Sequence, residues 1–331
     1  MVVGRPGAPG GRRSSSVGAV SPPSEGLPSL SLVVVVHDMV RELPRTLRSL
    51  SPGYQRDVTA GDYEVIVVDN GSPRSVDREV VGGFEGGLRL ERIDPAPPSP
   101  ACAANHGLRL AEGDLVGLIV DGARLASPGL LAEARRAALL SRRPVITAAA
   151  FHLGSVPHMR AAEVGYDEHA EDELLARCGW EADGYRLFEV STLGGSWGRG
   201  LFGPAGESSS LFCPRAIWDE LGGLDERFAL PGGGLVNHDL YRRACALDEV
   251  ELIALLGEGT FHQYHGGAAT SRRHSWDEMH AEYEAIIGMP HRPPTNLPLY
   301  VGPARPALLP HIERSARRAA ERIRRERMQP E

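Results

Sequence analysis

The stretch 115-LVGLIVDGARLASPGLL-131 joins an apolar segment, a charged turn and a helix start. Its first part is rich in aliphatic residues up to Asp121, which is typical of a strand buried on both faces of a parallel sheet. Ser127 and Pro128 then favour a helix, with the serine as N-cap and the proline at the first helical position. Open α/β sheets bind ligands at such strand ends, so we expect Asp121 in a functional site.

The rest of the first half repeats this alternation of strands and helices. Continuous apolar runs predict buried strands, and leucines spaced three to four residues apart predict helices. We expect strands over residues 30–36, 64–68, 88–93 and 144–151, and helices over 43–50, 101–111 and 128–140. This order predicts an α/β fold with a mainly parallel, doubly wound sheet.

The second half of the chain is less regular. It is rich in glycine, and its expected elements are short. They are strands over 211–215 and 250–256, a helix over 216–221, a helical segment from His238 to Arg243, and a histidine-rich turn over 259–267.

The composition excludes several classes of protein. The 331-residue chain carries a net charge of −7, which argues against nucleic-acid binding. All 36 basic residues are arginines, so mechanisms that need a lysine, such as a P-loop or a pyridoxal Schiff base, are excluded. We find no apolar run of membrane-spanning length and no secretory signal. We therefore expect a cytoplasmic protein.

Three of the expected strands end in an acidic residue, namely Asp38, Asp69 and Asp121. Each alone is as consistent with a helix cap or a solvated loop as with a site. Because the carboxyl ends of parallel strands meet at one edge of a sheet, we expect the three carboxylates to converge on a single crevice.

An ordered set of motifs resembles family 2 inverting glycosyltransferases with the GT-A fold. Each motif is short, but together they follow the family's order over roughly residues 30 to 270. The motifs are LSLVVVVH (30–37), VIVVDNGS (65–72), NHGLRLAEGDLVGLIVDGARL (105–125), GGLDERF (222–228), HDLYRR (238–243) and GTFHQYHGG (259–267).

Composition and the resemblance together predict an organisation into four parts. These are a disordered leader (1–28), a half that binds the nucleotide-sugar (29–151), an acceptor-binding and catalytic half (152–295), and a basic helical tail (296–331). The arginine-rich tail is expected either to pack on the domain as a solvated helix or to contact the inner face of a membrane.

The resemblance also implies a donor site. Backbone and side-chain groups after the first two strands would hold the base and ribose, because carboxylates accept hydrogen bonds from base N–H groups and ribose hydroxyls. The implied nucleotide-sugar-binding residues are Val36, His37, Asp38, Asp69, Asn105, Asp121 and Arg124. The donor would be UDP-, GDP- or dTDP-linked.

A divalent cation, Mg²⁺ or Mn²⁺, is the implied cofactor. Asp121, His262 and His265 would be its ligands, with water completing the shell. The second acid of the family's D-x-D motif is missing, because Ala123 stands in its place. Metal-free neutralisation of the diphosphate by Arg124 therefore stays open beside metal binding.

Asp239 is the implied general base, which would take the proton from an acceptor hydroxyl as that oxygen attacks the anomeric carbon. A register two residues away stays open, because the acids usual around this position are absent. Trp197, Glu207 and His238 are expected to bind the acceptor, a glycan, a lipid-linked molecule or a small molecule.

We therefore predict a hexosyltransferase-like enzyme that transfers a sugar with inversion. A nucleotidyltransferase is the rival enzyme, but the Gly-rich, basic phosphate loop that it needs after the first strand is missing. The alternative from another class is a catalytically degenerate GT-A protein that binds nucleotide-sugar or glycan without turnover. Ala123 favours that alternative, whereas Asp239 and the histidine-rich turn favour the enzyme.

Overall fold

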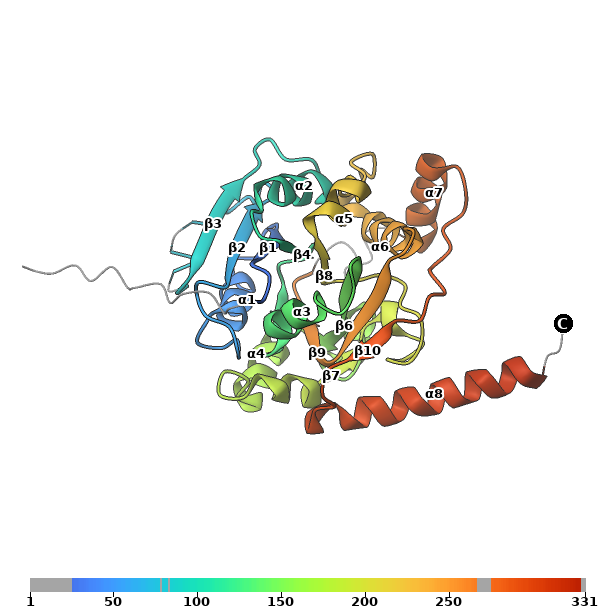
Figure 1. Ribbon diagram of the computed structural model, residues 1–331. Helices are drawn as coiled ribbons and strands as arrows, with labels where there is room; N and C mark the ends of the chain where they lie inside the picture. Colours follow the sequence, from blue (N-terminus) through green and yellow to red (C-terminus); the bar gives the residue numbers. More distant parts are fainter. Residues whose placement is uncertain (1–25, 78, 83, 267–274, 329–331) are drawn as a thin grey trace, which may run out of the picture.

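The computed structural model describes residues 26–77, 79–82, 84–266 and 275–328. Most of the expected leader therefore lies outside the described residues. A ten-stranded mixed sheet in the order β10-β9-β6-β8-β4-β1-β2-β3 forms the centre (Figure 1), with β5 and β7 paired to β9 and β6 beside this path. Its strands are β1 (Leu30–Val36), β2 (Tyr63–Asp69), β3 (Gly87–Arg92), β4 (Leu115–Ile119), β5 (Arg124–Ala126), β6 (Pro144–Leu153), β7 (Ser191–Leu193), β8 (Leu211–Pro214), β9 (Glu251–His262) and β10 (Leu299–Val301).

Most neighbouring strands of this sheet are parallel, as expected from the alternating pattern. The strands β3, β2, β1 and β4 run parallel, and so do β6, β9 and β10. The exception in the middle is β8, which is antiparallel to both β4 and β6. The fold is therefore a mixed α/β architecture in which the expected parallel sheet has an antiparallel strand at its centre.

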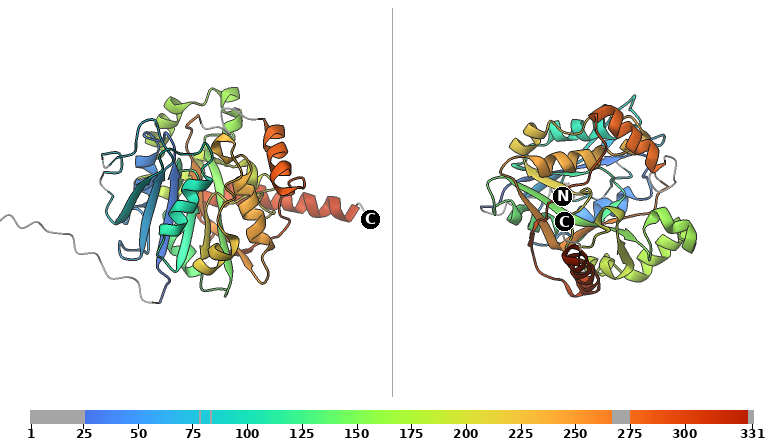
Figure 2. Two further views of the ribbon diagram at one scale, coloured as in Figure 1. Left: turned by 90° about the horizontal axis from the view of Figure 1, so that it is seen from above. Right: turned by 90° about the vertical axis from the view of Figure 1, so that its right-hand side faces the viewer.

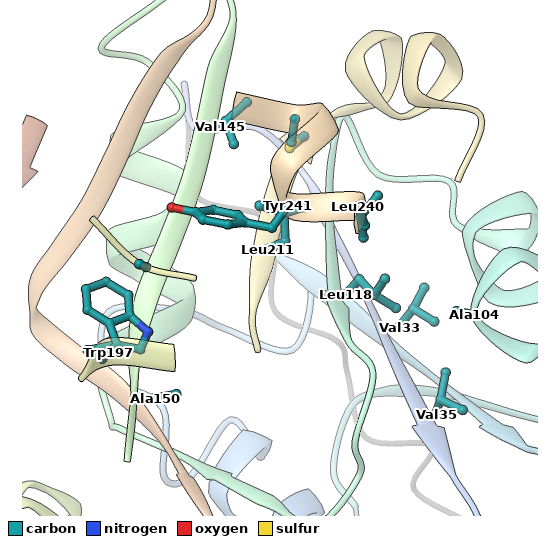
Figure 3. Close-up of a cluster of buried hydrophobic side chains, with 14 of the residues drawn as sticks. Val33, Val35, Ala104, Leu118, Val145, Ala150, Trp197, Leu211, Leu240 and Tyr241 are labelled. Atoms are coloured by element: carbon teal, nitrogen blue, oxygen red, sulfur yellow. The ribbon is translucent and has the colours of Figure 1, made fainter. Parts of the chain in front are cut away.

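Helices cover both faces of the sheet. The α-helices of the described residues are α1 (Leu43–Leu50), α2 (Ala101–Leu110), α3 (Leu130–Ala137), α4 (Glu168–Cys178), α5 (Arg215–Leu221), α6 (Val236–Ala246), α7 (Trp276–Ile287) and α8 (Leu309–Met328). Alternate residues of β1 belong to two separate hydrophobic clusters: Val33 and Val35 pack with α2, and Val34 packs with α1 and α3. Figure 3 shows the first cluster, with Ala104 of α2 close to Val33. Because successive side chains of a strand point to opposite faces, this burial on both faces explains the unbroken apolar run.

The helix α3 begins later than the sequence predicts. It starts at Leu130, and Ser127 is not its N-cap. The Ser127 hydroxyl instead donates to the carboxylate of Glu258 on β9 (2.6 Å), which also accepts from the Gly129 amide (3.0 Å). A carboxylate distant in sequence thus binds the amide just before the helix, where its negative charge suits the helix dipole.

The expected histidine-rich turn and the expected C-terminal tail also differ in part from their predicted structures. The first part of the expected histidine-rich turn is the end of β9, which extends to His262. The expected tail contains β10, a strand of the central sheet, before the predicted helix α8. Figures 1 and 2 show the C-terminal end of α8 projecting beyond the body. Among the described residues, no helix is both long and apolar enough to cross a membrane, and membrane contact of α8 stays a prediction.

Candidate functional site

The chain after β4 passes very close to the end of β1. The Gly122 amide donates to the Val35 carbonyl (2.8 Å), and a Cβ at Gly122 would lie 2.3 Å from Cγ1 of Val36. Only glycine fits such an approach. The next side chain, Ala123, is fully buried in the cluster formed with α1 and α3. The position expected to hold the second acid of a D-x-D motif therefore faces the hydrophobic core, whereas Asp121 does not.

Three polar side chains form one row across the adjacent strands β6, β9 and β5. His262 of β9 pairs with His152 of β6 in the parallel ladder and with Arg124 of β5 in the antiparallel ladder. Paired residues project from the same face of a sheet. The register therefore brings two imidazoles and a guanidinium together beside Asp121.

Three side chains that the resemblance implies as metal ligands converge on one point: Asp121, His262 and His265. The Nε2 atom of His262 lies 2.6 Å from Oδ2 of Asp121, and Nε2 of His265 lies 3.5 Å from that oxygen and 3.2 Å from Nε2 of His262. These three atoms could ligate one ion. Two imidazoles and one carboxylate are a mixed donor set for a divalent transition metal, because imidazole suits Zn²⁺ and the carboxylate also suits Mn²⁺.

The protonation states of this triad depend on burial and on mutual contact. Burial raises the pKa of Asp121, but the two imidazoles outweigh it and hold that pKa well below its ordinary value. Burial lowers the pKa of His262 to about 4 despite the carboxylate beside it. Burial also lowers the pKa of His265, yet Asp121 outweighs this effect and the net shift is upward. The carboxylate is therefore ionised at neutral pH, as a metal ligand must be.

A second group of histidines adjoins the triad through His262. The His158 backbone N–H donates to Nδ1 of His152 (3.1 Å), Nε2 of His158 lies 2.9 Å from the Leu153 carbonyl, and the Nδ1 atoms of His158 and His262 lie 2.9 Å apart. Sequence analysis missed both His152 and His158. His152 could have been found because it directly follows an expected strand, as Asp121 does. His158 lies in an irregular segment and had no such signal.

Arg124 contributes an unpaired positive charge. Its Nε and Nη1 atoms are buried and have no hydrogen-bond partner, and within the described ranges no carboxylate oxygen lies within 4.0 Å of its guanidinium. Arg124 nonetheless acts electrostatically on His262 and on Glu207. Buried polar groups in folded proteins are nearly always paired, so this guanidinium is suited to bind an anion.

The expected nucleotide-binding residues after β1 and β2 lie at one edge of the sheet. The Val36 carbonyl accepts from the Asn70 amide (2.8 Å), whereas His37 and Asp38 are exposed. Asp38 has a positive φ of 52°, which is uncommon outside glycine. Asp69 is fully buried, and its carboxylate is bound by Ser72 and Arg92. Through these contacts Asp69 holds the loop after β2 in place.

The expected acceptor and base residues divide between two sides of α6. Glu207 accepts from Asn237 (2.9 Å) and lies 3.6 Å from Nδ1 of His238. Although burial raises the pKa of Glu207, His238 and Arg124 give it a net downward shift. Asp239, by contrast, is only 1% exposed.

The carboxylate of Asp239 is bound by neighbours on its own helix. It accepts from Arg242 (2.8 Å) and from Nε of Arg243 (2.7 Å), and Arg243 also donates to the Leu221 and Gly223 carbonyls. The structure therefore brings Glu207 and His238 together, and it places Asp239 in an ion-pair network that joins α6 to the end of α5.

Two other expected site residues have structural contacts. Asn105 donates to the Leu224 carbonyl (2.9 Å) and accepts from its amide (2.8 Å), so it joins α2 to the loop after α5. Trp197 is 2% exposed and belongs to the hydrophobic core, where Figure 3 shows it near Ala150. A ring so enclosed has no free face on which a sugar could stack.

Comparison with known proteins supports the fold. No family model matches the sequence. The uncharacterized protein y4gI of Sinorhizobium fredii (strain NBRC 101917 / NGR234) is 26% identical over 224 residues, which cover 62% of this chain and only 21% of that relative's length. Because of this short coverage, the activity of the whole relative carries no conclusion for this chain.

Two solved structures are similar to this chain to different degrees. The structure of S. aureus TarS residues 1–349 in complex with UDP-GlcNAc has a TM-score of 0.50 at 14% identity, over 80% of this chain and 68% of that chain. The mannosyltransferase PcManGT from Pyrobaculum calidifontis, in complex with GDP-Man and Mn²⁺, has a TM-score of 0.47 at 17% identity, over 91% and 72%. The TarS likeness shows that this chain has a GT-A-like glycosyltransferase fold.

Proposed function

We propose that this protein is an inverting glycosyltransferase that moves a sugar from a nucleotide-diphosphate-sugar to a hydroxyl acceptor. One observation carries the proposal: the unpaired guanidinium of Arg124 lies beside the converging donor atoms of Asp121, His262 and His265. A diphosphate with a divalent cation would complement both features at once. In support, TarS, which shares the fold, was solved with UDP-GlcNAc.

The donor set also favours one class of cation. Mg²⁺ is bound through oxygen ligands and waters, whereas imidazole nitrogens suit transition metals, so two histidine ligands favour a transition metal such as Mn²⁺ or Zn²⁺ over Mg²⁺. When bound, the ion would supply charge neutralisation for the departing nucleoside diphosphate. Asp121, His262 and His265 would hold it, and Arg124 would bind a phosphate oxygen of the leaving group.

The proton of the acceptor hydroxyl needs a carboxylate base, and two candidates exist. Asp239, which the resemblance implies as the general base, stays a prediction. The contacts favour Glu207, because it lies beside His238 and within the electrostatic influence of Arg124, while both oxygens of Asp239 are bound by arginines. A base that is placed to accept the proton during attack on the anomeric carbon contributes about 10²- to 10⁴-fold in rate.

A donor screen tests the proposal. Thermal shifts measured across UDP-, GDP- and dTDP-sugars identify the donor, because a ligand that binds only the folded state raises the melting temperature. Release of nucleoside diphosphate is then measured with that donor and a panel of hydroxyl acceptors. We expect Asp121→Asn to abolish Mn²⁺-dependent nucleotide binding. Loss of turnover with donor affinity kept, in either Glu207→Gln or Asp239→Asn, identifies the base.

The ion pairs of Asp239 favour a second candidate, a protein that binds nucleotide-sugar without turnover. Donor binding with no release of diphosphate for any acceptor would support this binding role over catalysis. If no nucleotide-sugar shifts the melting temperature and Mn²⁺ does not bind together with UDP, the donor site itself is refuted.

A further inference from the structure

We propose that His158 is a positioning residue that fixes the tautomer of His262, so that Nε2 of His262 presents its lone pair to a cation. The inference rests on the proposed cation site and adds a residue that touches neither donor nor ion. It follows from the direction of each hydrogen bond in a chain from the Leu153 carbonyl through His158 and His262 to Asp121.

The Leu153 carbonyl fixes the tautomer of His158. Its Nε2 lies 2.9 Å from the Leu153 carbonyl, an acceptor that cannot donate, so Nε2 carries the hydrogen. The side chain is 1% exposed, and no carboxylate among the described residues pairs with it. A buried imidazole without an anionic partner is neutral. It has a single N–H, so its Nδ1 is an acceptor.

The tautomer of His158 in turn fixes the tautomer of His262. The Nδ1 atoms of His158 and His262 are 2.9 Å apart, and since His158 accepts there, Nδ1 of His262 must donate. Nε2 is then the nitrogen of His262 that is left to supply a lone pair to a cation, and it lies 2.6 Å from Oδ2 of Asp121 and 3.2 Å from Nε2 of His265. In the metal-free protein a proton on this side, shared with Asp121 or donated by His265, holds these atoms together, and a bound cation would replace it.

The hydrogen-bond partners of each nitrogen distinguish the two histidine groups that could hold an ion. In the group of His152, His158 and His262, Nδ1 of His152 is bound by the His158 amide and Nδ1 of His158 is bound by His262. Hydrogen bonds therefore satisfy these atoms without a metal. In the group of Asp121, His262 and His265, the facing atoms contact one another through shared protons that a cation can replace, so the cation belongs on that side.

Two variants of His158 distinguish the hydrogen-bond relay, which runs from the Leu153 carbonyl through His158 to His262, from simple packing of an aromatic ring. His158→Phe keeps an aromatic ring between its neighbours Tyr166 and Tyr264 but removes both hydrogen bonds. His158→Gln can donate to the Leu153 carbonyl with its amide N–H and accept from His262 with its amide oxygen. His311→Phe is the matched control, because it breaks the same kind of bond, to the Phe188 carbonyl (2.9 Å), and contacts none of the three proposed ligands.

Mn²⁺ affinity and the His262 tautomer are measured separately. By isothermal titration, His158→Phe is expected to weaken Mn²⁺ binding by about 10- to 100-fold, the usual effect of losing a residue that orients a ligand. His158→Gln should recover most of that loss, and His311→Phe should bind Mn²⁺ like the wild type. Imidazole ¹⁵N shifts of the metal-free wild type should show His262 protonated on Nδ1, a state that His158→Phe should abolish.

The outcomes distinguish this inference from the site on which it rests. Protonation of His262 on Nε2 alone in the metal-free wild type overturns the relay whether or not Mn²⁺ binds. Equal Mn²⁺ affinity of His158→Phe and the wild type also overturns it. If the wild type binds no Mn²⁺ but shows the expected tautomer, the relay stands and the proposed cation site fails. Near-ultraviolet circular dichroism confirms that each variant is folded.

Discussion

Replacing Arg124 with methionine should stabilise the free protein and weaken its binding of nucleotide. Two nitrogen atoms of the guanidinium are buried without partners, and methionine keeps much of the apolar stem while removing them. An unsatisfied buried polar group costs about 1–3 kcal/mol, so the free energy of unfolding should rise by about that amount. At about 2 °C per kcal/mol, the melting temperature should rise by about 2–6 °C.

The same change should remove a charge-assisted hydrogen bond to a phosphate oxygen. Such a bond contributes about 1.5–3 kcal/mol, which corresponds to an affinity for UDP lower by about 10- to 150-fold. Thermal melts and UDP titrations of the wild type and Arg124→Met measure the two effects. A variant that melts below the wild type refutes the reasoning, because Arg124 would then have a stabilising partner in the free protein.

Arg135 supplies the matched control for this experiment. It is more deeply buried than the partly exposed Arg124, it forms an ion pair with Asp62 (2.8 Å), and its Nε donates to the Pro28 carbonyl (2.8 Å). Breaking a buried ion pair from one side costs about 3–5 kcal/mol. Arg135→Met should therefore lower the melting temperature, opposite in sign to Arg124→Met, and should leave the affinity for UDP unchanged in the folded protein.

Three further predictions concern stability. Trp197→Ala should cost about 3–5 kcal/mol in urea unfolding, as expected for a core aromatic, and an unchanged urea midpoint would contradict this placement. Asn105→Ala should cost about 1–3 kcal/mol, because it leaves Leu224 backbone groups unpaired, and UDP affinity should not change. Burial lowers the pKa of His291 to about 4 and also lowers that of His311. Unfolded histidines titrate near 6.5, so stability should be greatest above pH 6.5 and fall towards pH 4; urea midpoints that rise on acidification would contradict this.

Local pattern was sufficient to predict the parallel strands of the first half. The run from Leu30 to Val36 is apolar throughout, and burial on both faces permits no other pattern. The convergence of Asp121 with His262 was predicted from the resemblance. The antiparallel strand β8 was not predicted, because its direction depends on pairing with β4 and β6, which lie far away in sequence.

The roles of single charged residues could not be predicted in the same way. Asp69 and Asp239 both end up beside arginines: Arg92 lies across the β2–β3 ladder, and Arg243 lies one helical turn along α6. A carboxylate at a strand end or a helix start has the same sequence signal whether it binds a ligand or an arginine. The distinction depends on side-chain partners that the tertiary structure selects.

The contact between Arg305 and Glu258 (3.1 Å) decides how far the C-terminal end can be shortened for crystallisation. A shortened form that ends at residue 295, the sequence-based boundary, would lack this arginine and leave a buried carboxylate without its cation. It would also remove β10 and expose β9, the strand that carries His262, as an unprotected sheet edge. A form that ends after Arg322, which still donates to the Phe202 carbonyl (2.9 Å), would keep these contacts and remove part of the projecting end of α8.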